Sequence, residues 1–89
     1  MNINEIFEKY TSNVLKNIDK DNFKKILDFL EKENCNFLDE IIEDYLDIFM
    51  IDYDCFIKKY TYLNNKYNNK YLEYVSEDMN LLEELYYDI

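Results

Sequence analysis

The fold is decided by the stretch NFKKILDFLEK, residues 22–32, in which apolar side chains recur at helical spacing. They stand at i, i+3, i+4 and i+7, which places them along one face of an α-helix: Phe23, Ile26, Leu27 and Leu30. The spacing predicts a helix over 22–32. Asp21 is its expected N-cap, because a carboxylate there can accept from the free backbone N–H groups of the first turn.

The same spacing recurs along the rest of the chain and predicts four more helices. They cover residues 4–18, 37–50 with Asn36 as the cap, 53–67 with Asp52 as the cap, and 70–87. Clusters of Asn and Asp separate them, and in a chain without Gly or Pro these residues are the best suited to left-handed turns. Ser76 is either a surface serine or the N-cap of a break in the last helix. Strand-like alternation never persists for more than four residues, so the sequence predicts an all-α fold, a compact bundle of four to five short amphipathic helices.

Length and composition indicate one domain spanning residues 1–89. The chain is 48% hydrophobic, which is enough for a core, and it has no apolar run long enough to cross a membrane. The first residues lack the features of a secretory signal, so we expect a cytoplasmic protein. Cys35 and Cys55 flank the predicted helix 37–50, which would hold them roughly 20 Å apart, too far for a disulfide. We therefore expect two reduced, buried or half-buried thiols.

Two absences remove most catalytic signatures. The chain has no histidine, the commonest general base and transition-metal ligand, and no glycine, which phosphate-binding loops and calcium loops require. We therefore expect neither an enzyme nor a bound cofactor or metal.

Charge is sorted into blocks, and the net charge is −10. Seven acids and no lysine lie between Cys35 and Cys55, four lysines and no acid from Phe56 to Leu72, and six acids and no lysine from Glu73 to Ile89. Within the predicted helix 37–50 the acids form two rows at i, i+4 spacing, where like charges repel: Asp39, Glu43 and Asp47 in one, Glu40 and Asp44 in the other. Two explanations stay open. In the first, the acidic face is solvated or is neutralised by Lys58, Lys59 and Lys66 of the next helix. In the second, the acidic face docks on a basic partner by imitating a phosphate backbone.

The last helix carries a second acidic set and a surplus of apolar side chains. Its candidate docking residues are Glu77, Glu83, Glu84, Leu81, Leu85 and Tyr87. The apolar surplus indicates either a terminal helix wrapped into the core or a partner or dimer interface with aromatic anchors.

Lysine and tyrosine alternate over residues 58–71, a composition that can bind single-stranded nucleic acid by stacking and phosphate contact. We favour the other explanation, in which Tyr60 and Tyr67 belong to the core and the lysines pair with acidic helices. A net charge of −10 repels phosphate, so direct binding of nucleic acid is not expected.

These features predict a small acidic protein that binds a basic partner and occludes its nucleic-acid-handling surface. The size, the charge and a composition favoured by A/T-rich codons are typical of phage or low-GC bacterial proteins. Phage inhibitors of host defence nucleases, of the anti-CRISPR kind, share this character, and so do nuclease immunity proteins. The alternative is a homodimeric helical scaffold or assembly protein whose charge blocks pair between copies.

Overall fold

The stretch that decides the fold forms the central helix, α3 (Lys20–Lys32), in a computed structural model that describes residues 3–9 and 18–86. As predicted, Phe23, Ile26, Leu27 and Leu30 are buried along one face. The N-cap is Asp19 rather than Asp21. Its carboxylate accepts from the backbone N–H groups of Asp21 and Asn22 at 3.0 and 3.2 Å, the reach of a side chain that precedes the first helical residue.

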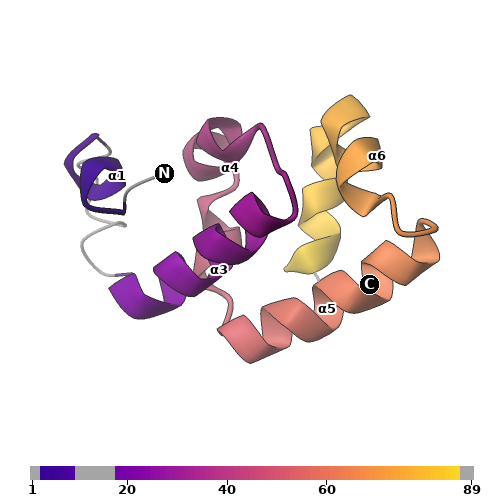
Figure 1. Cartoon of the computed structure of the whole chain (residues 1–89), viewed down its shortest axis with the longest axis horizontal. Helices are drawn as coiled ribbons and strands as arrows, with labels where there is room; N and C mark the ends of the chain where they lie inside the picture. Colours follow the sequence, from indigo (N-terminus) through magenta and orange to yellow (C-terminus); the bar gives the residue numbers. More distant parts are fainter. Residues whose placement is uncertain (1–2, 10–17, 87–89) are drawn as a thin grey trace.

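The described residues form α-helices and 3-10 helices and contain no strand. Their order is α1 (Ile3–Lys9), α3, α4 (Leu38–Asp44), η1 (Leu46–Met50), α5 (Tyr53–Lys66), α6 (Tyr71–Glu77) and η2 (Met79–Leu85). α4 and η1 pack against α3, while α6 and η2 pack against α5 (Figure 1). The Cα radius of gyration is 12.6 Å, close to the roughly 12 Å of a compact chain of this length. The predicted all-α bundle is confirmed.

The predicted helix 4–18 is covered only in part. α1 spans Ile3–Lys9 and buries Ile6 in the core, whereas Ile18 is half-buried and not helical. Residues 10–17 lie outside the described part of the chain.

The helix predicted over 37–50 is broken at Tyr45, whose φ of −134° and ψ of 42° are not helical. α4 ends at Asp44, and η1 continues as a 3-10 helix. The break changes the direction of the chain at η1, and Phe49 of η1 then stacks on Phe23 with ring centroids 4.4 Å apart. The predicted cap is wrong as well, since α4 begins after Phe37 without a side-chain cap.

The helix predicted over 70–87 is also broken, at Asp78 and not at Ser76. Asp78 has φ −143° and ψ 95°, and its carboxylate accepts from the backbone N–H of Asn80 at 3.1 Å to begin η2. Ser76 is a surface serine whose hydroxyl donates to the carbonyl of Glu73 at 2.6 Å. The break folds η2 back, so that Tyr71 donates from its hydroxyl to the Leu81 carbonyl at 2.8 Å.

Asparagine supplies the left-handed turns, as expected of a chain without glycine. After α3, Asn34 has a φ of 63°, and the N–H of Cys35 donates back to the Leu30 carbonyl at 3.0 Å. After α5, Asn68 and Asn69 have φ of 57° and 64°. The N–H of Asn69 donates to the Asn64 carbonyl at 2.7 Å. Both helices therefore end in a Schellman motif, in which the left-handed residue is usually glycine.

The N-terminus of α5 is capped from another helix. Asp52 occupies the N-cap position but makes no side-chain cap bond. Instead the Asn22 side chain accepts from the Tyr53 N–H at 2.9 Å and donates to the carbonyls of Ile51 at 2.7 Å and Phe49 at 3.3 Å. This amide clamps α3 to the η1–α5 junction.

A chain of aromatic contacts joins α3, α5 and α6. Phe29 packs edge-on against Tyr60 at 4.9 Å, Tyr60 against Tyr71 at 5.8 Å, and Tyr71 meets Tyr67 at 5.6 Å. Tyr60 is buried and Tyr67 half-buried against the core, so the core interpretation of these two tyrosines is confirmed.

Candidate functional site

Five of the seven acids of the first block lie on the surface of α4 and η1. Leu38, Ile41 and Ile42 turn to the core, which leaves the remaining face of α4 to carboxylates. The exposed acids are Asp39, Glu40, Glu43, Asp44 and Asp47. Two i, i+4 pairs survive within α4, Asp39 with Glu43 and Glu40 with Asp44. The expected third member of one row does not continue it, because Asp47 follows the break at Tyr45 and belongs to η1.

Much of this charge lacks an internal counterion. Within residues 3–9 and 18–86, Asp39, Glu40, Asp44 and Asp47 form no ion pair, and neither Lys58 nor Lys66 of α5 pairs with α4 or η1. The ammonium of Lys66 instead lies 5.5 Å from the ring centroid of Tyr67. The face is therefore not neutralised by these two lysines, and it projects its field into solvent.

The second acidic set is divided between surface and structural positions. Glu77 and Glu83 are exposed, but Glu84 is half-buried and accepts from the Tyr67 hydroxyl at 3.1 and 3.3 Å. Burial raises the pKa of Tyr67, and the hydrogen bond and negative charge of Glu84 raise it further. Glu84 therefore helps to hold η2 on α5, whereas Glu77 and Glu83 are available at the surface.

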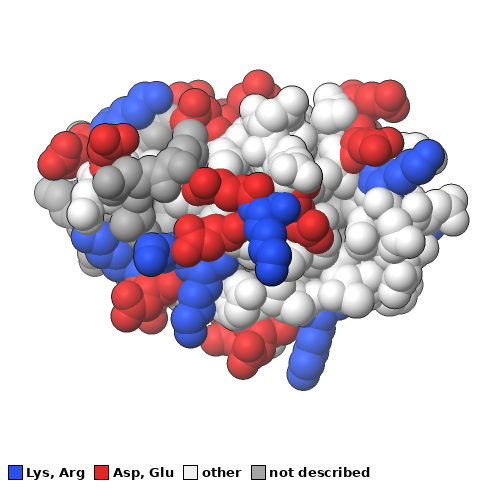
Figure 2. Space-filling view, in the orientation of Figure 1, with Lys and Arg blue, Asp and Glu red and all other residues white. Residues whose placement is uncertain are grey.

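The two acidic blocks approach each other where the Tyr45 hydroxyl donates to the Asn80 side chain at 3.2 Å. Asp44 immediately precedes one partner of this bond, and Asp78 caps the turn that carries the other. Figure 2 shows carboxylates along the edge of the molecule over α4 and a second group over α6 in the same view. We call the exposed acids of α4, η1, α6 and η2 the acidic surface: Asp39, Glu40, Glu43, Asp44, Asp47, Glu73, Glu77, Asp78 and Glu83.

The apolar residues expected at the docking surface lie mostly inside. Leu85 is 5% exposed and belongs to the core, and Leu81 is half-buried against it. Tyr87 lies outside the described residues. Burial in the core therefore accounts for Leu85, and its side chain is not available to a partner. Among the described residues, the large apolar side chains that reach the surface are Met50, Tyr62 and Tyr74. Tyr62 and Tyr74 lie off the helical stripes, and that is the signal from which their exposure could have been predicted.

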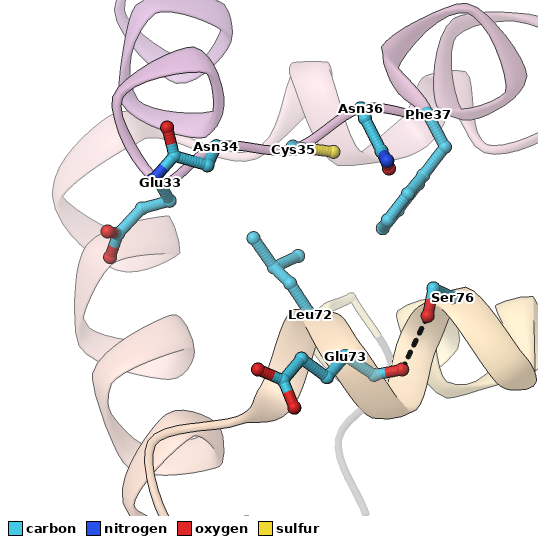
Figure 3. A pocket seen from close by; sticks show the side chains of 8 residues that line it. All are labelled: Glu33, Asn34, Cys35, Asn36, Phe37, Leu72, Glu73 and Ser76. Atoms are coloured by element: carbon cyan, nitrogen blue, oxygen red, sulfur yellow. Dashed lines mark hydrogen bonds between the residues drawn. The ribbon is translucent and has the colours of Figure 1, made fainter.

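A groove lies between the turn after α3 and the face of α6, and its volume is about 370 Å³ (Figure 3). Its lining residues are Glu33, Asn34, Cys35, Asn36, Phe37, Leu72, Glu73 and Ser76. Sequence reasoning missed it, because the groove depends on how the left-handed turn at Asn34 packs against α6.

The two thiols differ in environment, and both are free. Cys35 is buried beside the groove. Burial raises the pKa of its thiol, with a partly opposing effect from the backbone N–H of Phe37, so the thiol is held protonated. Cys55 is exposed on α5, which corrects the expectation of a buried or half-buried thiol.

In the part of the chain that the structure describes, no helix has the length and apolar character needed to cross a membrane. The same residues contain no group of three or more acids and cysteines placed to hold a metal ion.

Comparison of the chain with protein-family models, with curated proteins and with solved structures found no match.

Proposed function

We propose that the protein binds a basic partner protein through its acidic surface and thereby occludes a site where the partner holds nucleic acid. The observation that carries the proposal is the α4–η1 face, where four exposed carboxylates have no ion pair within the described residues. Of these, Glu40 and Asp44 stand at i and i+4 on α4, about 6 Å apart along the helix axis. A rigid row of negative charges at this spacing resembles the phosphates along one nucleic-acid strand.

The core beneath supports this role because it fixes the row in place. Leu38, Ile41 and Ile42 anchor α4, and Phe49 on η1 stacks on Phe23 of α3. Carboxylates on an anchored helix lose less conformational entropy on binding than carboxylates on a flexible tail. A field of one sign also speeds association with an oppositely charged partner and suppresses direct binding of nucleic acid.

Inhibition of a defence nuclease, in the manner of an anti-CRISPR protein, and neutralisation of a nuclease by an immunity protein are the two biological settings that fit this chemistry. In both, the partner is a nuclease or other nucleic-acid-binding effector. Charge and size support both settings equally.

The experiment is affinity capture with two variant proteins at low and high salt. The first variant, D39K/E43K/D47K, changes α4 and η1, and the second, E77K/E83K, changes α6 and η2. Glu84 and Asp78 are left unchanged because their carboxylates accept from the Tyr67 hydroxyl and from the Asn80 backbone N–H. The captured partner should itself bind nucleic acid, should be lost in the first variant, and should be weakened in the second and at high salt. Retention of the partner by both variants at both salt concentrations contradicts the proposal.

A second candidate is a homodimer in which the acidic surface of one copy faces α5 of another. The supporting observation is Tyr62, which is 64% exposed and lines a small hollow with Lys59 and Lys66. Sedimentation at low salt distinguishes the candidates. A dimer that dissociates on changing Tyr62→Ala supports the scaffold, whereas a monomer at all concentrations removes it.

A further inference from the structure

We propose that the groove between residues 33–37 and α6 is a socket for one arginine side chain of the partner. The inference deepens the proposed function, on which the identity of the partner as a basic protein rests. The groove lies outside the α4 row, so it adds a specific anchor to a surface otherwise recognised by its field.

The walls of the groove come from two elements. The turn after α3 supplies one wall, held by the left-handed Asn34 and the Cys35-to-Leu30 backbone bond, and α6 supplies the other through Leu72, Glu73 and Ser76. Figure 3 shows the carboxyl groups of Glu33 and Glu73 toward one end of the hollow, with the Glu33 side chain directed outward, and Phe37 and Ser76 toward the other end. The groove therefore has a negative end and an apolar side.

The negative end lacks a cation of its own. Glu33 and Glu73 are exposed, and among the described residues neither forms an ion pair. A second hollow of about 140 Å³ continues the groove, sharing Glu33, Leu72 and Glu73 and adding Lys70 at its edge. Lys70 is not within ion-pairing distance of either carboxylate among the described residues, so two carboxylates without an ion pair border this end of the groove and one lysine lies at its edge.

This lining suits a guanidinium better than other groups. Its planar fork of five N–H donors matches carboxylates and amide oxygens, and the lining offers Glu33, Glu73 and the side chain of Asn36. The three methylenes of arginine can lie on Leu72 and Phe37 while the charged head reaches the carboxylates. Ser76 already donates its hydroxyl proton to the Glu73 carbonyl, which leaves its oxygen free to accept. A phosphate or carboxylate ligand would meet like charge here.

The test is an NMR titration of the isotope-labelled protein with N-acetyl-arginine amide, which needs no knowledge of the partner. We expect saturable amide shifts confined to residues 33–37 and 70–76, with a Kd in roughly the millimolar range for so small a ligand. N-acetyl-citrulline amide has nearly the same shape without the charge and should bind at least about tenfold more weakly. Equal responses to the two probes, or no saturable shift at these residues, overturn the proposal.

Matched variants separate a socket from general attraction. E33Q/E73Q should weaken arginine binding by about tenfold or more, because charged hydrogen bonds are lost. E40Q/E43Q removes the same charge from α4 and should leave binding unchanged, while K70Q should strengthen it. An equal loss in both double variants overturns the socket. Since capture of the partner is measured separately, failure of this titration and failure of the proposed function give different results.

Discussion

At the scale of single residues, asparagine occupies several positions that glycine or a capping carboxylate takes in other proteins. Asn34, Asn68 and Asn69 adopt left-handed conformations at the ends of α3 and α5. The sequence predicts these turns, because Asn and Asp clusters are the best candidates in a chain without glycine. The role of Asn22 was not predictable, since it depends on a junction 27–31 residues further along the chain.

Replacing Asn22 should destabilise the fold more than its half-buried position suggests. Asn22→Ala leaves the carbonyl of Ile51 and the N–H of Tyr53 without their side-chain partner, at a cost of about 1–3 kcal/mol. Urea unfolding measures this loss in the free energy of unfolding. Asn65→Ala is the matched control, because Asn65 is an exposed residue of α5 whose side chain makes no comparable bonds in the described structure. A free energy of unfolding equal in the two variants would remove the clamp from this account.

At the scale of elements, hydrophobic spacing predicted the helices α3 and α5 well and the two acidic helices less well. The hydrophobic spacing shows which side chains share a helix face, but it does not show whether the backbone stays helical through Tyr45 or Asp78. Both breaks are decided by distant partners, since Phe49 stacks on Phe23 and Tyr71 bonds to Leu81. The breaks also explain why the acidic row stops at Asp44 and why Leu85 enters the core.

The aromatic contacts between α5 and α6 give stability a dependence on alkaline pH. Burial, followed by the negative charge of Glu33, raises the pKa of Tyr60 to about 12, and burial raises that of Tyr71 as well. These raised pKa values stabilise the folded state only while the tyrosine hydroxyls are protonated. The stabilisation is therefore complete below the ordinary tyrosine pKa of about 10 and is lost as the pH rises from there through 12.

The variant Tyr60→Phe should flatten this dependence. The free energy of unfolding of the unaltered protein should fall by about 2–3 kcal/mol more than that of the variant between pH 10 and 12, which corresponds to about two pKa units. Tyr62→Phe, at an exposed position of the same helix, should keep the slope of the unaltered protein. Denaturant unfolding at a series of pH values tests this prediction. Parallel plots of the free energy of unfolding against pH for all three proteins would contradict it.

At the scale of the whole molecule, the fold brings together charge blocks that are separate in the sequence. The Tyr45–Asn80 bond brings the end of α4 to the start of η2, so acids from both blocks share one region. The sequence predicted which acids are exposed, because they lie off the apolar stripes. It did not predict that Glu84 is partly enclosed, or that a groove forms beside Glu33 and Glu73.

The central claim is that the acidic surface takes the place of nucleic acid on a partner, and a competition measurement tests it most directly. The captured partner is mixed with fluorescently labelled nucleic acid, and the protein is titrated in while anisotropy is recorded at two salt concentrations. The account predicts full displacement of the nucleic acid, more weakly at high salt, and at least about tenfold weaker with D39K/E43K/D47K. A partner that keeps its nucleic acid while saturated with the protein would contradict the claim.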